Sequence, residues 1–275
     1  MATAAGSPAR RRGHDAELED LERFAHYPSL VGRVAVVTGG ATGIGASIVA
    51  HLCAQRARVA FLDIAESEGR ALATDLAAQG RPEPLPVPCD VRDIDALRTA
   101  LAQITQMLGP PSVLVNNASS DRRTHRDDIS PQEWDDLLAV NLRPHFFAIQ
   151  ALAPAMVVQG GGSIVNLGSI SAHADFVDLA GYIAAKAAIE GLTRTMAREL
   201  GPANIRVNCV VPGWVMTDRQ RGTVVTPEDL AALEAKQSLK VRLLPADVAR
   251  LVLWLTADDS RAATGQRWVV DGGWM

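Results

Sequence analysis

Cysteine, net charge and long apolar runs are all scarce in this sequence. Its three cysteines, Cys53, Cys89 and Cys209, lie far apart and show neither Cys-x-x-Cys nor zinc-type spacing. We therefore expect free and mostly buried thiols. The histidines show no metal-ligand spacing either, so the sequence indicates no metal site.

The low charge and the short apolar segments exclude two further classes of protein. A formal net charge of −4 gives no field that would attract nucleic acid or anionic lipid. No stretch approaches the roughly eighteen consecutive apolar residues that a membrane-spanning helix needs, and the N-terminus lacks the apolar core of a signal peptide. We therefore expect a cytoplasmic protein that binds neither nucleic acid nor membranes.

The first part of the chain, residues 1–27, is polar and highly charged and has no strand pattern. An arginine run at 10–12 is followed by an acidic stretch at about 17–22. A basic run can signal targeting or nucleic-acid binding, but the neighbouring acids offset this one. We predict a flexible N-terminal extension with a short helix.

Between residues 28 and 275, short β-branched apolar runs alternate with longer amphipathic patterns. Continuous apolar strands separated by helices are typical of a parallel sheet that is buried on both faces and joined by right-handed crossovers. We therefore predict a single α/β domain over 28–275, a doubly wound, parallel, seven-stranded sheet with helices on both faces. The predicted strands are 34–38, 59–63, 85–90, 113–116, 163–167, 205–211 and 268–270, and the predicted helices are 43–55, 67–78, 93–107, 131–158, 182–200 and 245–256.

A glycine-rich segment, Thr38-Gly39-Gly40-Ala41-Thr42-Gly43-Ile44-Gly45, follows the first predicted strand and runs directly into a helix. Glycines allow a tight turn and a close backbone approach to a pyrophosphate, which then lies on the free N–H groups and the positive end of the helix. Glycine-rich turns are common, but the position between a strand and a helix favours a dinucleotide-binding turn.

The second predicted strand ends at Asp63, eighteen residues beyond Gly45. A carboxylate at this point would accept hydrogen bonds from the adenosine ribose hydroxyls, although a strand-end turn residue or a helix cap is the alternative interpretation. The anion would also repel a 2′-phosphate, and the glycine turn contains no basic residue to compensate it. The sequence therefore favours NAD over NADP.

Two further predicted strand ends would lie beside the same cofactor site. Asp90 and Val91 follow the third predicted strand and could contact the adenine, while Asn117 and Ala118 follow the fourth and could fix the backbone near the ribose. Both segments could equally be caps or turns.

Tyr182 and Lys186 are four residues apart, so on a helix they share one face and lie within reach of each other. Ser169 follows the fifth predicted strand. Free tyrosine has a pKa of about 10, so a base role at neutral pH requires positive charge nearby, here the ammonium and a nicotinamide ring. In this interpretation Tyr182 takes a hydroxyl proton, Ser169 orients the reacting oxygen, and Asn141 anchors a water for proton exchange.

The alternative is that Tyr182 and Lys186 form an ordinary helix edge and that Ser169 is a helix cap. The chain contains only two tyrosines, and this one lies on the carboxyl side of a strand beside the serine. That position favours the catalytic interpretation.

Together these motifs resemble the short-chain dehydrogenase/reductase family from about residue 30 to the C-terminus. The residues that carry the resemblance are Thr38–Gly45, Asn116–Ala118, Asn141, Ser169, Tyr182, Lys186, Pro212, Gly213, Thr217 and Val270–Gly273. The resemblance implies a Rossmann fold, a Ser-Tyr-Lys-Asn tetrad, cofactor binding before substrate, and a homotetramer built on the helices around 131–158 and 180–200. The implied cofactor contacts are Gly39, Thr42, Gly43, Ile44, Gly45, Asp63, Ile64, Asp90, Val91, Asn117, Ala118, Tyr182, Lys186, Pro212, Gly213, Val215 and Thr217.

Within this family the chain is most similar to bacterial aldose 1-dehydrogenases, which oxidise the anomeric carbon of a cyclic sugar to a lactone. The similarity lies in segments 27–30, 61–65, 161–171 and 211–213, in His173 and in Arg219-Gln220. It implies substrate contacts from Ser120, Asp121, Ser169, His173, Tyr182, Trp214 and Gln220, under a loop at about 214–240 with Trp214 and Met216 as apolar walls. Packing of these two side chains against a neighbouring helix is the alternative.

The chain departs from that subgroup at positions that would face the substrate. Segment 119–125 reads Ser-Ser-Asp-Arg-Arg-Thr-His, and Ala172 replaces an aromatic residue. A different secondary alcohol or ketone is therefore an alternative substrate. A protein of another class, a nucleotide-binding regulator or scaffold, is a further alternative because fold does not fix function, but the complete tetrad argues against it.

Overall fold

The computed structural model describes residues 24–217 and 226–275, so most of the predicted extension at 1–27 lies outside the described residues. The strands are β1 (Val34–Thr38), β2 (Arg58–Asp63), β3 (Leu85–Pro88), β4 (Val113–Asn116), β5 (Gly162–Leu167), β6 (Ile205–Pro212) and β7 (Arg267–Val270). The α-helices are α2 (Gly43–Ala54), α3 (Glu66–Ala78), α4 (Ile94–Leu108), α5 (Pro131–Asn141), α6 (Arg143–Val158), α7 (Ala180–Leu200), α9 (Pro227–Lys236) and α10 (Pro245–Thr256). Short 3-10 helices are η2 (Pro28–Leu30), η3 (Ile170–Ala172), η4 (Gly201–Ala203) and η5 (Asp258–Ser260).

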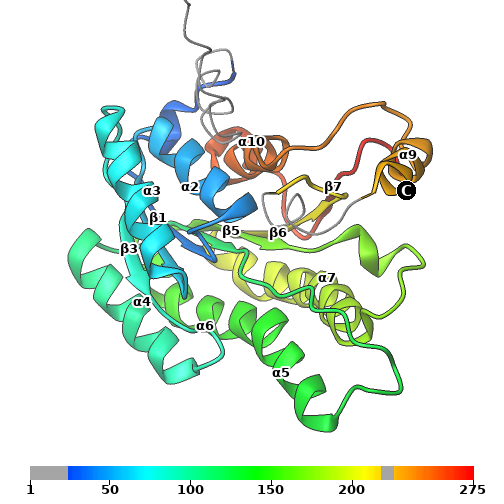
Figure 1. The fold of residues 1–275 in the computed structure, drawn as a ribbon. Coiled ribbons are helices and arrows are strands. Elements are labelled where there is room, and N and C mark those ends of the chain that lie inside the picture. Colours follow the sequence, from blue (N-terminus) through cyan, green and yellow to red (C-terminus); the bar gives the residue numbers. More distant parts are fainter. Residues whose placement is uncertain (1–23, 218–225) are drawn as a thin grey trace, which may run out of the picture.

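The seven strands form one parallel sheet in the order β3-β2-β1-β4-β5-β6-β7. The order reverses between β1 and β4, which is the switch point where doubly wound sheets bind their ligands. Helices α2, α3 and α10 lie on one side of the sheet and α4, α5, α6 and α7 on the other (Figure 1). The prediction of a doubly wound seven-stranded domain is confirmed.

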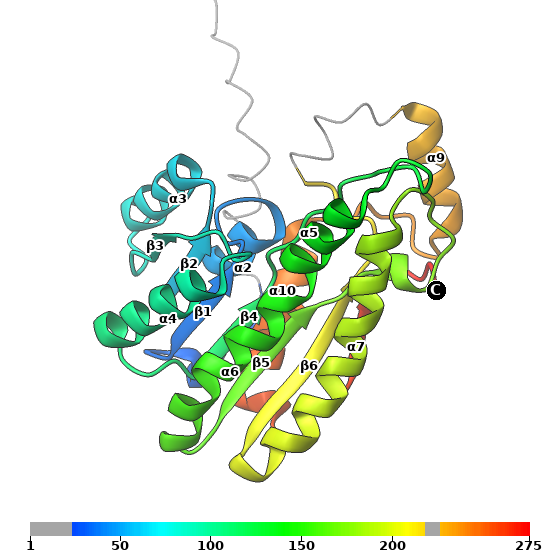
Figure 2. The ribbon, with the colours of Figure 1, turned by 90° about the horizontal axis from the view of Figure 1, so that it is seen from below.

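Two hydrophobic clusters fill the space between the sheet and its helices. Along β1, Ala35 and Val37 pack into the cluster under α2 and α10, whereas Val36 packs into the cluster under α4 and α6. Alternate residues of a strand point to opposite faces, so both sides of this strand are buried and its sequence is apolar throughout. Figure 2 shows α4, α6 and α7 lying along one face of the sheet.

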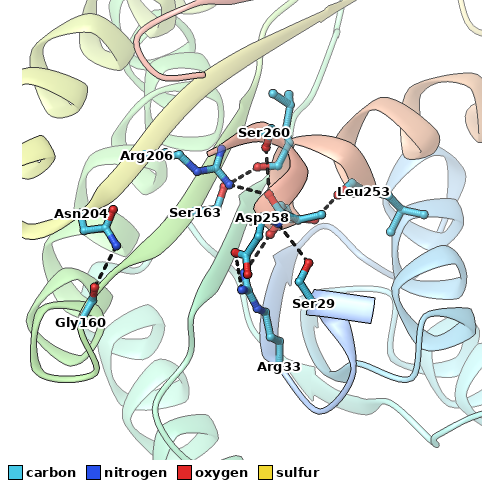
Figure 3. Close-up of polar contacts among 12 residues, drawn as sticks. Ser29, Arg33, Gly160, Ser163, Asn204, Arg206, Leu253, Asp258 and Ser260 are labelled. Carbon is cyan, nitrogen blue, oxygen red and sulfur yellow. Dashed lines mark hydrogen bonds and ion pairs between the residues drawn. The ribbon is translucent and has the colours of Figure 1, made fainter. Parts of the chain in front are cut away.

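The amino ends of the strands are closed by polar contacts around the end of α10 (Figure 3). Arg33 donates to Asp258 over 2.5 Å, and the amide of Asp258 donates to Ser29 over 3.1 Å. Arg206 donates to the carbonyl of Ala257 over 3.1 Å. These contacts satisfy the exposed polar groups of the helix end, and they lie at the edge of the sheet opposite to the strand ends at which ligands bind.

One predicted helix is divided in two. The sequence predicts a continuous helix over 131–158, whereas the chain breaks at Leu142, whose φ and ψ are −125° and −53°. Pro144 has no amide hydrogen, and its ring would collide with the carbonyl of Val140 in a continuous helix. The break puts Asn141 at the end of α5, next to the strand ends.

A second difference lies in the segment 214–240, which the sequence analysis interprets as a loop. This segment contains α9, so it is helical over ten of its residues. Thr226-Pro227 at its start is a usual beginning for a helix, because proline is tolerated in the first turn. Gln220 lies in the part of this segment that is outside the described residues.

The cysteines are free and buried, as the sequence predicts. Cys53, Cys89 and Cys209 are all buried, and desolvation raises the pKa of Cys53 and Cys209 to about 12 and that of Cys89 to about 11. Among the described residues, none of the helices has both the length and the apolar character that crossing a bilayer requires.

Candidate active site

A cleft of about 1670 Å³ lies beyond the carboxyl ends of the strands, along the switch point of the sheet. This volume exceeds the 300–1,000 Å³ or so that a single drug-sized ligand needs, and it offers room for a dinucleotide and a small substrate together. Every cofactor contact implied by the sequence lines it, from Gly39 to Thr217. Of the implied substrate contacts within the described residues, Ser120, Asp121, Ser169, Tyr182 and Trp214 also line the cleft.

The glycine turn is closed around its own backbone. Gly39 has a positive φ of 67°, and a Cβ on Gly45 would lie 1.8 Å from the carbonyl oxygen of Gly39. Only glycine fits at Gly45, because that oxygen occupies the place of a side chain. This contact brings the start of α2 against the end of β1. The amide groups at the start of α2 then border the cleft, which suits a pyrophosphate group.

Asn117 braces this turn from β4. Its Nδ2 donates to the carbonyl oxygens of Thr38 and Gly39 over 3.0 and 2.8 Å, and its backbone amide donates to the Thr38 hydroxyl over 2.9 Å. The side chain of Asn117 is therefore occupied within the protein. Asn117 thus fixes the shape of the glycine turn, through partners that the sequence did not reveal.

The carboxylate of Asp63 is held in place by two backbone amides. Oδ2 accepts from Ala41 over 2.9 Å, and Oδ1 accepts from Ala65 over 3.0 Å. Two fixed hydrogen bonds orient the charge at the end of β2, where it borders the cleft. The same contacts tie β2 to the glycine turn, which agrees with the turn interpretation of this residue, and its ribose contact stays a prediction.

Asp90 lies on the same wall but is engaged by a neighbour. Its carboxylate accepts from the guanidinium of Arg92 over 2.6 to 3.0 Å, and hydrogen bonding to Arg92 lowers the pKa of Asp90. The arginine also lines the cleft. Arg92 lies outside the glycine turn, so the sequence pattern of that turn gave no sign of it, and Asp90 compensates its charge.

Lys186 is the most deeply buried charged side chain of the cleft, with an exposed fraction of 1%. Its ammonium donates to the carbonyl oxygen of Leu167 over 2.8 Å and lies 5.5 Å from the ring centroid of Tyr182. Desolvation lowers the pKa of Lys186 to about 8, with Cys209 and Asp121 opposing the shift. A positive charge is thus held beside the tyrosine in a region of low dielectric, where it acts strongly.

Ser169 is the N-cap residue of η3, just after the end of β5, and lines the cleft with Tyr182. Its Oγ accepts from the amide of Ser171 over 3.1 Å and from the hydroxyl of Ser171 over 2.9 Å. Ser169 is therefore a cap, as one interpretation of the sequence held. Because its oxygen already accepts two hydrogen bonds, its own proton is the group that it can offer to a ligand.

Asn141 is fully buried and does not line the cleft. Its Nδ2 donates to Leu137 and Ser120, and its Oδ1 accepts from the amide of Ser120 over 2.9 Å. The two bonds with Ser120 tie the end of α5 to the segment that follows β4. The side chain positions the backbone near Ser120, and the sequence hypothesis that Asn141 anchors a water gains no support from these contacts.

His173 is placed away from the cleft. Its Nε2 lies 2.5 Å from Glu190 on α7, and both ring nitrogens lie within 3.2 Å of Arg267 on β7. The imidazole is absent from the cleft walls, although the sequence assigned it a substrate contact. Both of its partners are far away in the sequence, so no local pattern could reveal them.

Three aromatic side chains line the cleft near the end of β6. Phe176 lies 6.4 Å from Trp214 and 5.8 Å from Trp274 between ring centroids. Sequence analysis proposed Trp214 as a wall but missed Phe176 and Trp274. The position of Trp274, directly after the Val270–Gly273 motif, was the available signal.

Comparison with known proteins identifies the class. The family model described as Enoyl-(Acyl carrier protein) reductase matches residues 39–275. The chain is also 47% identical over 250 residues to D-xylose 1-dehydrogenase of Caulobacter vibrioides, covering 91% of this chain and 98% of that protein. The chain therefore belongs to the short-chain dehydrogenase/reductase family.

Other relatives have different names. A probable galactose dehydrogenase of Rhizobium meliloti is 43% identical over 249 residues, covering 90% of this chain and 97% of that one. Among solved structures, 3-oxoacyl-[acyl-carrier protein] reductase from Brucella melitensis superposes with a TM-score of 0.85 at 32% identity, covering 100% of this chain and 98% of that one. A blue fluorescent protein from a metagenomic library, solved with NADPH, gives a TM-score of 0.82 at 36% identity, covering 90% and 99%.

These relationships define an oxidoreductase that acts on a CH–OH group with a nicotinamide cofactor. The residues present fit such a cofactor, because the glycine turn leaves the backbone next to the cleft bare of side chains where a dinucleotide would lie.

Proposed function

We propose that the protein oxidises the anomeric CH–OH group of an aldose to the corresponding lactone, with NAD as the electron acceptor. The observation that carries the reaction is the meeting of Ser169, Tyr182 and the buried Lys186 in one cleft with the glycine turn. The similarity to D-xylose 1-dehydrogenase and to a probable galactose dehydrogenase supports a sugar as the substrate.

In this proposal Tyr182 acts as the base. Its phenolate takes the proton of the anomeric hydroxyl while the C–H bond of the same carbon is broken and a C=O bond forms. The bound nicotinamide supplies the chemistry of accepting the hydride. Lys186 stabilises the phenolate by its charge, since the ammonium lies close to the ring and is shielded from water.

Ser169 orients the reacting oxygen of the substrate. Its hydroxyl donates a hydrogen bond to that oxygen, because its acceptor capacity is used by Ser171. Asp121 and Ser120 border the substrate end of the cleft and bind the remaining sugar hydroxyls. Asn141 keeps this segment in place through Ser120 and is a positioning residue.

Asp63 is the basis of the proposed preference for NAD. Its fixed carboxylate accepts hydrogen bonds from ribose hydroxyls and repels a 2′-phosphate. Arg92, the cation that borders this part of the cleft, is held by Asp90. This pairing leaves little positive charge to attract the extra phosphate of NADP.

Assembly and location are part of the same proposal. We expect a cytoplasmic homotetramer built on α5, α6 and α7. Large apolar side chains are exposed on two of these helices, Trp134 on α5 and Phe146, Val157 and Val158 on α6. Such exposure on neighbouring helices suits a subunit interface. Light scattering coupled to size-exclusion chromatography measures the molecular mass, and a monomer would contradict the proposed assembly.

The reaction is tested with purified protein, NAD and a panel of aldoses, polyols and secondary alcohols. We expect NADH absorbance to rise with one or more aldoses and lactone to appear in equal amount. Activity on a secondary alcohol but on no sugar would overturn the sugar proposal and retain the oxidoreductase. Substitution Tyr182→Phe is expected to lower turnover by at least about a hundredfold and leave NAD binding intact.

Tyr27→Phe is the matched control, because Tyr27 is the other of the two tyrosines and does not line the cleft. It removes the same hydroxyl group elsewhere and should retain full turnover. Near-normal turnover in Tyr182→Phe would remove Tyr182 from the mechanism.

A further inference from the structure

The C-terminal segment enters the substrate end of the cleft. Trp274 lines the same cleft as Ser169 and Tyr182, together with Phe176 from the segment after η3 and Trp214 from the segment after β6. Phe176 is the centre of the group, at 6.4 Å from Trp214 and 5.8 Å from Trp274 between ring centroids. We call these three side chains the aromatic wall.

The aromatic wall is anchored next to the catalytic serine. Phe176 and Trp274 both pack against a small apolar cluster that includes Ile170, the residue after Ser169, and Val211 on β6. The cluster connects the wall to the strand ends on which the reacting group would lie. A ligand oriented by Ser169 and Tyr182 is therefore within the same enclosure as the wall.

A tight turn fixes the position of Trp274. Asp271 is 6% exposed, and its two carboxylate oxygens accept from the amides of Gly273 over 2.7 Å and Met275 over 2.8 Å. Gly272 and Gly273 have φ values of 71° and 80°, which glycine adopts without strain. The Val270–Gly273 motif thus fixes the position of Trp274. Neither cofactor binding nor the proposed catalytic residues account for this role of the motif.

The segment after α9 holds the turn from the other side. The amide of Leu239 donates to Gly272 over 2.8 Å, and the amide of Ser238 donates to Gly273 over 3.1 Å. The ammonium of Lys236 lies 5.1 Å from the ring centroid of Trp274. Trp274 therefore lies between residues whose backbone is held by hydrogen bonds, and its side chain also contacts Lys236.

Trp214 brings a polar group into the wall. Its indole Nε1 is buried and has no hydrogen-bond partner within the described residues. A buried donor without a partner is unfavourable, so native proteins satisfy almost all of them. The indole ring itself lines the cleft, so a ligand oxygen that displaces the atoms covering Nε1 is the partner that we assign to this N–H.

We propose that the aromatic wall recognises a cyclic substrate, with a pyranose ring packing its C–H face on Trp274 and Phe176 while Trp214 Nε1 donates to a ring hydroxyl. This proposal rests on the proposed sugar oxidation and explains which sugars the enzyme would select. Aromatic rings stack on flat, weakly polar faces, and an indole offers an apolar body with one polar tip. An open-chain polyol has no such face, so the wall selects ring-closed sugars over their linear counterparts.

The wall is tested first by kinetics with the aldose that the enzyme oxidises best. Trp274→Ala is expected to raise the KM for the sugar about tenfold and to leave kcat and the Kd of NAD within about twofold. Met275→Ala is the matched control, because it truncates the neighbouring side chain, which does not line the cleft. A KM in Trp274→Ala equal to that of Met275→Ala would overturn the proposal.

The hydrogen bond of Trp214 has its own matched pair. Trp214→Phe keeps an aromatic ring and removes the indole N–H, and it should raise the KM about fivefold. Trp268→Phe removes an indole N–H that donates to Asn208 over 3.2 Å, outside the cleft, and should leave the KM unchanged. Equal KM values in these two variants would remove Trp214 from substrate recognition.

A binding measurement separates the wall from the reaction. The probe is a cyclic anhydropentitol, which keeps the pyranose ring but has no anomeric hydroxyl, titrated by calorimetry into the enzyme with NAD. We expect binding that Trp274→Ala weakens about tenfold, and no detectable binding of the linear pentitol. If the probe binds in this way and no aldose is oxidised, the proposed reaction fails and the wall stands. If aldoses are oxidised and Trp274→Ala binds the probe as well as the wild type does, the wall fails and the reaction stands. No binding of the probe by the wild type would also overturn the wall.

Discussion

The ammonium of Lys186 donates to the carbonyl oxygen of Leu167 over 2.8 Å, so α7 and the end of β5 meet through a single buried charge. A charged group with 1% exposure is unfavourable, because it has lost its hydration and gained little in exchange. The contact therefore fixes the ammonium in the cleft, while the buried charge lowers the free energy of unfolding. The position is fixed where the charge can act on Tyr182.

This cost predicts that Lys186→Met is a stabilising substitution. Burial lowers the pKa of Lys186 from 10.5 to about 8, a difference worth about 3 kcal/mol at neutral pH. Methionine has a similar shape without the charge, so the free energy of unfolding should rise by about 2–3 kcal/mol while activity is lost. Denaturant unfolding of both proteins measures the difference, and the exposed Lys240→Met is the control. A variant no more stable than the wild type would contradict the prediction.

The same pKa predicts how the stability of the wild type depends on pH. Between about 8 and 10.5 the unfolded chain keeps the Lys186 proton and the folded protein has released it, so the contribution of Lys186 to wild-type stability becomes more favourable as pH rises through this range. The advantage of Lys186→Met should shrink accordingly and disappear at the alkaline end. Unfolding curves for both proteins at several pH values give this difference directly. A difference that stays constant with pH would show that the lysine is not the cause.

Asp63→Asn tests the basis of the NAD preference with the least disturbance. The amide keeps an oxygen for one of the amides of Ala41 and Ala65 but removes the charge that would repel a 2′-phosphate. We expect the ratio of kcat/KM for NAD over NADP to fall about tenfold. Thermal unfolding of the variant shows whether the glycine turn is intact. A ratio unchanged in a folded variant would place the discrimination elsewhere.

Gly45→Ala tests the geometry of the turn. The new Cβ would lie 1.8 Å from the carbonyl oxygen of Gly39, which is backbone and cannot rotate away. Overpacking of this kind costs about 3 kcal/mol or more, and the shift of the turn should abolish cofactor binding. Gly201→Ala is the matched control, because its Cβ meets nothing within 4 Å and its φ is not positive. Nucleotide titration by fluorescence compares the two variants, and NAD binding by Gly45→Ala would refute the assigned role.

The sheet could be predicted from the sequence because its signals are local. The strands around Ala35 and Phe61 are continuous apolar runs, and their observed ends lie within two residues of the expected ones. The helix break at Leu142 was missed because the apolar pattern continues through it, while one proline prevents the continuous hydrogen-bond ladder. The apolar pattern favours a continuous helix, but the missing amide hydrogen of Pro144 ends the helix at this point.

In the candidate site, too, local features could be predicted from the sequence and contacts between distant segments could not. The glycine turn was predictable because its strand, turn and helix are adjacent in the sequence. The role of Asn117 was not, since its side chain acts on Thr38 and Gly39, nearly eighty residues earlier. His173 was expected in the cleft, but Glu190 and Arg267 hold its ring elsewhere. Contacts between distant segments decide what a side chain does, and a single sequence does not contain them.

His145 on α6 provides a test of the acid side of the stability curve. It is 1% exposed, and desolvation followed by the charge of Lys186 holds its pKa well below 6.5. The folded protein keeps this imidazole neutral while the unfolded chain takes up a proton, so stability falls as pH drops below about 6.5. In His145→Leu this loss is removed, and the stability difference between variant and wild type should grow towards low pH by up to about 1.4 kcal/mol per pH unit. The exposed His125→Leu controls for the loss of an imidazole as such. Denaturant unfolding between about pH 7.5 and 5 measures the effect, and parallel curves for His145→Leu and the wild type would show that His145 is protonated in the folded state as readily as in the unfolded chain.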